Sequence, residues 1–244
     1  MSQHKLFTRF PAHRLEGALR FSTHGVRVGT EAPDFKLPDL GRKTVRLSDY
    51  RRKANVVLMF GSVTCGATAT QLRAGRPSIR SLYARYKKKG FEFFVIYTRE
   101  PHPAENIGQP ATLAERMKNA VQLKKEEKVN FPILIDTPDN RVRNVYRGWS
   151  NGIFVVNKEG MLVFRSSWTH GPELAQVLHD LYAWEKAQAE NELVRFCYSE
   201  RLVGLLRDKR ISASVHRRAG PQASRDFVRL LEAEGKNRLG HCAR

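Results

Sequence analysis

One of the cysteines, Cys65, lies at a position where the local structure predicted from the sequence could activate a thiol. Cys65 follows an apolar run from Asn55 to Phe60 and a short polar string from Gly61 to Thr64, and a stretch compatible with a helix comes after it. This order predicts a buried strand, a turn, and a helix whose first residue carries the thiol. The free N–H groups and the dipole of a helix N-terminus favour an anion. Because the thiolate is the reactive form of cysteine, the position predicts a lowered thiol pKa and thiol redox chemistry.

A structural role for Cys65 is the alternative, since a lone cysteine often serves as a small buried apolar residue. The chain has three cysteines, at positions 65, 197 and 242, and their wide spacing fits neither a disulfide framework nor a metal site. This usage is typical of a reducing compartment. Gly-Ala-Thr at 66–68 excludes a Cys-x-x-Cys pair, and with it dithiol exchange within the motif.

The apolar patterns along the chain predict alternating strands and helices. Expected strands lie at 44–47, 55–60, 91–97, 131–136, 153–157 and 161–164. Expected helices lie at 72–86, with a break at Pro77, and at 113–127, 140–147 and 172–196. Two parallel crossovers followed by an antiparallel hairpin indicate an α/β fold: a thioredoxin-like mixed central sheet with flanking helices.

Three regions are expected: a basic N-terminal extension at 1–28, the α/β domain at 29–190, and a basic helical C-terminal extension at 191–244. The extension should hold two helices, near 198–208 and 222–235, joined through 211–214 and 218–221. Its apolar side chains recur at helical spacing, so it has a face to bury. Those side chains are Leu202, Val203, Leu205, Leu206, Phe227, Leu230 and Leu231. The face could pack on the chain's own domain or dock on a second subunit or an acidic partner.

The chain is strongly basic, with 43 Lys and Arg against 24 Asp and Glu and a net charge of +19. Such a charge attracts polyanions and acidic proteins. The alternative is that the basic composition is general to the proteins of the source organism and has no functional role. No apolar run approaches the roughly 20 residues that span a bilayer. We expect a cytoplasmic protein without a membrane span. The Arg-rich, acid-poor start leaves an organellar matrix as the alternative.

Three segments carry a family resemblance, which covers roughly 29–185. The string from Ala32 to Leu40 resembles the N-terminal segment of redoxins of the peroxiredoxin and alkyl hydroperoxide reductase group. The string from Phe60 to Cys65 resembles the active-site segment of iodothyronine deiodinases and their bacterial relatives. Val95 to Pro103 resembles the second signature of that family, a strand that runs into Glu-Ala-His-Pro.

This resemblance implies a role for five residues. Cys65 would be the redox centre, and the hydroxyls of Ser62 and Thr64 would hydrogen-bond it. Glu100 and His102 would face it from the loop after the second strand. There His102 could exchange a proton with the thiol or the leaving group while Glu100 orients the imidazole. The alternative for Glu100 and His102 is a solvated loop pair.

The chain also departs from the deiodinase pattern. Residues 104–108 replace a Gly-Trp pair, and Pro110 stands where those enzymes have a further histidine. These differences oppose recognition of thyroid hormone.

The scattered histidines and the lack of a Gly-rich phosphate loop predict neither a metal nor a cofactor. We therefore expect a single-cysteine, thiol-dependent oxidoreductase that reduces a peroxide, a disulfide or a related electrophile. An external thiol reductant or redox protein, Cys197 or Cys242 would resolve the oxidised Cys65. Reductive dehalogenation is one alternative. A non-catalytic redoxin-fold subunit, which binds a partner or assembles into an oligomer through its basic tail, is the other.

Overall fold

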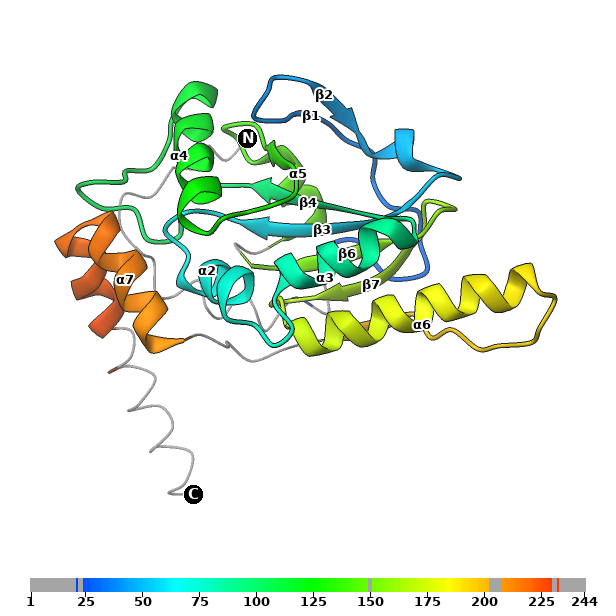
Figure 1. The fold of residues 1–244 in the computed structure, drawn as a ribbon. Coiled ribbons are helices and arrows are strands. Elements are labelled where there is room, and N and C mark those ends of the chain that lie inside the picture. Colours follow the sequence, from blue (N-terminus) through cyan, green and yellow to red (C-terminus); the bar gives the residue numbers. More distant parts are fainter. Residues whose placement is uncertain (1–20, 22–23, 149–150, 202–207, 230–231, 233–244) are drawn as a thin grey trace.

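A six-stranded mixed sheet lies at the centre of the molecule, in the strand order β5-β4-β3-β6-β7-β8 (Figure 1). The computed structural model describes residues 21, 24–148, 151–201, 208–229 and 232. The central strands β3 (Asn55–Gly61) and β4 (Phe91–Tyr97) are parallel and pair from Asn55 with Phe91 to Gly61 with Tyr97. β5 (Ile133–Ile135) adds to β4 in parallel, whereas β6 (Ile153–Val156) and β7 (Leu162–Ser166) form an antiparallel hairpin beside β3.

The two faces of the sheet bury alternate residues of β3. Val57 and Met59 belong to one core cluster, and Val56, Leu58 and Phe60 belong to another. The first face packs under the helices α2 (Gly66–Arg73), α3 (Ile79–Tyr86), α4 (Leu113–Glu126) and α6 (Gly171–Ala189). The second packs against α5 (Arg141–Tyr146) and the segment that holds β1 (Lys36–Pro38), β2 (Thr44–Arg46) and the 3-10 helix Leu47–Tyr50. Cover on both faces explains why β3 is one continuous apolar run.

The observed order of elements confirms the expected α/β fold with a mixed sheet and flanking helices. The helix after β3 is split as predicted, because α2 ends at Arg73 and α3 begins after its N-cap Ser78. α6 is shorter than the expected 172–196 and ends at Ala189. Asn191 there has a φ of 57°, a left-handed conformation that asparagine tolerates and that ends a helix.

The expected helix at 198–208 is wrong at its start. Ser199–Arg201 forms the strand β8, which pairs in parallel with the free edge of β7. An ion pair between Glu200 and the fully buried Arg165 accompanies this pairing. The open edge supplied backbone partners that outweighed the local helical pattern.

The position of the next helix also differs from the prediction. The helix α7 (Lys209–Ala219) occupies the stretch expected to be a connection, and the Asp208 side chain caps it by accepting from the N–H groups of Arg210 and Ile211. Residues 221–229 are helical, in agreement with the helix expected at 222–235. The apolar positions at 202–206, 230 and 231 lie outside the described residues.

Residues 208–229, called here the C-terminal segment, pack against the chain's own domain. α7 lies directly against α2, beside the end of the sheet where α2 begins (Figure 1). Ala219, Ala223 and Phe227 of this segment are buried. Of the two alternatives for the extension, its described part therefore shows packing on its own domain. Among the helices that the structure describes, none is long and apolar enough to cross a membrane.

Candidate redox site

Cys65 is the N-cap residue of α2, as predicted. Its backbone is extended, with φ −93° and ψ 106°, and its sulfur accepts the N–H of Thr68 at 3.4 Å. The side chain is 4% exposed and packs with Ala67 and Trp168. The N–H group of Thr68 and the helix dipole both favour a negative sulfur here. The site thus has the means to stabilise a thiolate in a largely water-excluded position.

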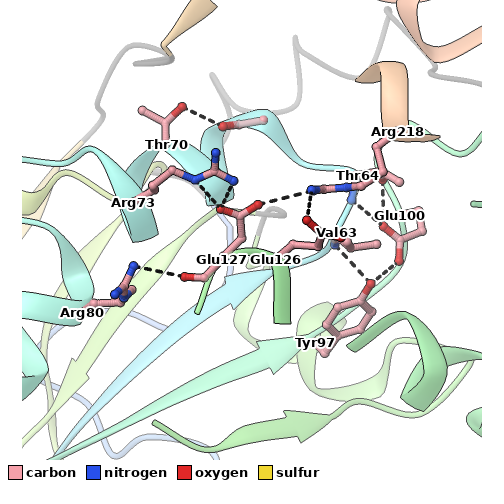
Figure 2. A network of polar contacts seen from close by, with 11 residues as sticks. Val63, Thr64, Thr70, Arg73, Arg80, Tyr97, Glu100, Glu126, Glu127 and Arg218 are labelled. Atoms are coloured by element: carbon pink, nitrogen blue, oxygen red, sulfur yellow. Dashed lines mark hydrogen bonds and ion pairs between the residues drawn. The ribbon is translucent and has the colours of Figure 1, made fainter. Parts of the chain in front are cut away.

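The turn before the thiol is fixed by a buried carboxyl group (Figure 2). Oε2 of Glu100 accepts the backbone N–H of Thr64 at 3.1 Å and its hydroxyl at 2.7 Å. Oε1 accepts the hydroxyl of Tyr97 and, at 3.2 Å, the side-chain amide of Asn119. Tyr97 in turn accepts the N–H of Val63 at 3.1 Å. Glu100 thus connects the ends of β3 and β4 to α4.

Burial shifts the pKa values of the titratable groups in and beside this network. It raises the pKa of Glu100 above its ordinary value, although the hydrogen bonds from Tyr97, Thr64 and Asn119 oppose the shift. The pKa of Tyr97 is raised well above its ordinary value by burial first and by Glu100 next. Arg116, fully buried, donates to the carbonyls of Asp136 and Thr137, and burial lowers the pKa of its guanidinium.

His102 joins the same network through its backbone. Its N–H donates to the Thr64 hydroxyl at 3.3 Å, and the side chain is 9% exposed. The ring lies against two residues of the C-terminal segment, with centroid distances of 4.4 Å to His216 and 6.5 Å to Phe227. Because Glu100 is fully buried and His102 nearly so, the solvated-pair alternative is wrong.

The expected hydrogen bonds from Ser62 and Thr64 to the sulfur are not found. The Thr64 hydroxyl has one proton, and it donates that proton to Glu100. Within the described part of the chain, the buried hydroxyl of Ser62 has no hydrogen-bond partner. What Ser62 supplies is its carbonyl, which accepts the N–H of Cys65 at 3.2 Å. Both residues shape the turn that presents the thiol.

Several residues of the site were missed by the sequence reasoning. Tyr97 and Asn119 hold Glu100, Trp168 covers Cys65, and His216 packs on His102. Tyr97 ends an apolar strand, where an aromatic residue is expected for packing alone. His216 comes from the extension, which lies beyond the residues, roughly 29–185, that carry the family resemblance. Among the described residues, no three His, Cys, Asp or Glu side chains gather into a group that could hold a metal ion.

The C-terminal segment is tied to α2 and α4 by a charged cluster (Figure 2). Arg73 donates two hydrogen bonds to Glu127, at 3.0 and 2.8 Å. Arg218 of α7 bridges Glu126 at 2.9 Å and Glu127 at 3.3 Å. Glu127 is fully buried, so it depends on these partners for compensation of its charge.

Comparison with known proteins agrees with this geometry. Residues 28–165, more than half of the chain, match the model of the AhpC/TSA family. The thiol-disulfide oxidoreductase ResA of Geobacillus kaustophilus (strain HTA426) is 35% identical over 136 residues, which are 55% of this chain and 66% of that protein. Thyroxine 5-deiodinase of Gallus gallus is 29% identical over 146 residues, 55% of this chain and 54% of that protein. The chain therefore spans slightly less than two thirds of the first of these relatives and about half of the second.

A solved structure shows the same fold. A thiol:disulfide interchange protein from Bacteroides sp. superposes with a TM-score of 0.51 and 19% identity, covering 65% of this chain and 91% of that one. At this identity the likeness concerns the fold, which is thioredoxin-like. The matched residues 28–165 contain the thiol turn and the Glu100 network. On these grounds the chain belongs to the AhpC/TSA family.

Proposed function

We propose that this protein is a thiol-dependent oxidoreductase with Cys65 as its redox centre. The observation that carries the proposal is the position of the sulfur at the N-cap of α2, where it accepts the Thr68 N–H group. A relative named as a thiol-disulfide oxidoreductase supports the same class of reaction. Glu100 and Thr64 act as positioning residues, because they fix the backbone immediately before the thiol.

The reaction needs thiols from outside the motif. With a disulfide, the Cys65 thiolate bonds to one sulfur, the S–S bond breaks, and the departing thiolate takes a proton. With a peroxide, an S–O bond forms as the O–O bond breaks, which leaves Cys65 as a sulfenic acid and releases water or an alcohol. Since residues 66–68 are Gly-Ala-Thr, regeneration of Cys65 depends on an external thiol reductant or redox protein. Its first thiol attacks the sulfenic acid, with loss of water, and forms a mixed disulfide with Cys65; after reaction with a disulfide the mixed disulfide is already present. A second thiol breaks that bond, which releases the reductant as a disulfide and returns the Cys65 thiolate. Cys197 is exposed on the approach to β8, and Cys242 lies outside the described residues.

Turnover of a small disulfide and of hydrogen peroxide, with dithiothreitol as reductant, tests the proposal. Cys65→Ser should abolish both activities, because no other thiol occupies a helix N-cap in the described chain. Cys197→Ser is the matched control and should retain them. Release of iodide from an iodinated phenol, lost in Cys65→Ser, would favour reductive dehalogenation instead. Equal activity of Cys65→Ser and the unmodified protein would exclude Cys65 as the redox centre.

A non-catalytic binding subunit is the alternative from another class. The net charge of +19 motivates it, with an acidic protein or a polyanion as partner. An inert Cys65 together with nucleic-acid binding that weakens steeply with salt would favour this alternative. Sedimentation at several concentrations would test the predicted oligomer in the same samples.

A further inference from the structure

The C-terminal segment packs on the loop that carries His102 and, through Ser212, on the residue that follows the thiol. The ring of His216 packs at a tilt on His102, with centroids 4.4 Å apart, and the ring of Phe227 lies 4.3 Å from that of His216. All three are buried. His216 and Phe227 lie beyond residues 28–165, which match the family model. The site is thus completed by a part of the chain outside the matched region.

The segment approaches α2 closely at the residue that follows the thiol. A Cβ placed on Gly66 would lie 2.6 Å from Oγ and 2.9 Å from Cα of Ser212. Distances this short are not sterically allowed, so only glycine fits at position 66 while α7 is docked. Ser212 is fully buried, and its hydroxyl has no hydrogen-bond partner within the described chain. A polar group is thus buried without compensation beside the first turn of α2.

Polar contacts hold both ends of α7 in place. At its start, the N–H of Asp208 donates to the Thr70 hydroxyl of α2 at 3.1 Å. At its end, Arg218 binds Glu126 and Glu127, as described above. The carbonyl of Ala219 accepts two backbone N–H groups from residues 106 and 107, in the loop that also carries His102. Docking of α7 and the arrangement of this loop are therefore linked.

We propose that the docked C-terminal segment limits by size which electrophiles reach Cys65, with Ser212 and His216 as specificity-determining residues. The inference rests on the proposed function, because it concerns the substrate of that same thiol. With the segment docked and Cys65 only 4% exposed, a low-molecular-weight electrophile is the substrate. A disulfide within a folded protein requires the segment to move away, because its polypeptide must approach the sulfur as well.

Two maleimides of one chemistry and different size test the inference on the full-length protein. N-methylmaleimide and N-(1-pyrenyl)maleimide both add to a thiolate, and mass spectrometry of the Cys65 peptide gives each rate separately from Cys197 and Cys242. The measured quantity is the ratio of the small-probe rate to the large-probe rate, relative to the same ratio for an unstructured cysteine peptide. In the unmodified protein we expect this ratio to be about tenfold or more above the peptide's, as reaction of the large probe waits for local opening.

Two variants release the segment in different ways. Arg218→Ala removes the ion pairs with Glu126 and Glu127, and Gly66→Ala places a methyl group against Ser212. Arg218→Ala should speed the large probe by about tenfold, the effect of losing one or two charged hydrogen bonds on the docking equilibrium. Gly66→Ala should speed it as well, because its methyl group cannot coexist with the docked Ser212. The small probe should change by less than about twofold, since its access does not depend on docking. Arg217→Ala, an exposed neighbour on α7, is the matched control and should leave the ratio unchanged.

The possible outcomes separate this inference from the proposed function. In the unmodified protein, Cys65 could react rapidly with both probes, with the same ratio of small-probe to large-probe rate as the peptide. That result would overturn the size limit and leave the redox role of Cys65 intact. An unchanged ratio in Gly66→Ala and Arg218→Ala, with native circular dichroism, would also overturn it. Failure of Cys65 to react with either probe in any variant would overturn both proposals. Amide hydrogen exchange of the unmodified protein is an independent check: the inference requires 209–219 to exchange faster than 55–61.

Discussion

The hydroxyl of Thr64 donates a 2.7 Å hydrogen bond to the buried carboxyl group of Glu100, and the backbone N–H of Thr64 donates to the same oxygen. Thr64 directly precedes the thiol-bearing Cys65, whereas Glu100 lies three residues beyond the end of β4. The paired contact therefore fixes the geometry of the thiol turn from a neighbouring strand. Reactivity at Cys65 should depend on residues that need not touch the sulfur.

Replacement of the carboxyl group should make stability less sensitive to pH. Because burial raises the pKa of Glu100 above its ordinary value of 4.5, the folded protein binds more protons than the unfolded chain just above that pH. Stability contributed by this group therefore falls as pH rises through that window. Urea titrations of the unmodified protein and of Glu100→Gln give the unfolding free energy of each at a series of pH values. The value for the unmodified protein minus the value for the variant should decrease from pH 4 upward. Parallel pH profiles, or a difference that increases with pH, would contradict the assignment.

Thr64→Val should affect stability and reactivity together. The substitution keeps the shape of the side chain but removes the hydroxyl that donates to Glu100 and accepts from His102. We expect a loss of about 1–3 kcal/mol in unfolding free energy, the usual effect of leaving buried polar groups without a partner. Oxidation of Cys65 by peroxide should slow as well. Thr64→Ser retains the hydroxyl and serves as control; if it behaves like Thr64→Val, the hydrogen bonds are not the cause.

Ser62→Ala should slow the reaction of Cys65 without lowering stability. The buried hydroxyl has no hydrogen-bond partner in the described structure, so its removal should leave the unfolding free energy within about 1 kcal/mol of the unmodified value or slightly above it. We expect the oxidation rate of Cys65 to fall severalfold, because a free hydroxyl in the thiol turn can reorient toward the reacting sulfur. Stopped-flow oxidation alongside thermal unfolding separates the two effects. A large loss of stability with an unchanged rate would assign Ser62 to packing alone.

His102→Ala should slow Cys65 chemistry more than His170→Ala does. His102 is nearly buried, shares Thr64 with Glu100 and packs on His216, whereas His170 caps α6 through its backbone only. Rates measured from pH 5 to 9 should show the larger change in both magnitude and pH profile for His102→Ala. If the two substitutions had similar, small effects on the rate, His102 would have no specific role in the reaction of Cys65.

The sequence predicted the fold and the thiol turn because both depend on local patterns. The apolar run of β3, the small residues after it and the helical spacing beyond them are visible in the chain itself. β8 and the site of α7 were missed because tertiary partners determine them: the free edge of β7 selects the strand Ser199–Arg201, and Thr70 and Glu127 select where α7 lies. The packing of His216 on His102 joins residues more than a hundred positions apart, and a single sequence carries no signal for such a contact.

Oxidation by a limiting amount of hydrogen peroxide, with a sulfenic-acid trap and mass spectrometry of each cysteine peptide, tests the central claim most directly. Peroxide is small enough to reach a thiol that is 4% exposed, and it selects for thiolate character. We predict that Cys65 is oxidised before Cys197 and Cys242 at neutral and mildly acidic pH, although Cys197 is exposed and Cys65 is buried. Earlier oxidation of Cys197 or Cys242 in the folded protein would contradict the account of Cys65 as the redox centre.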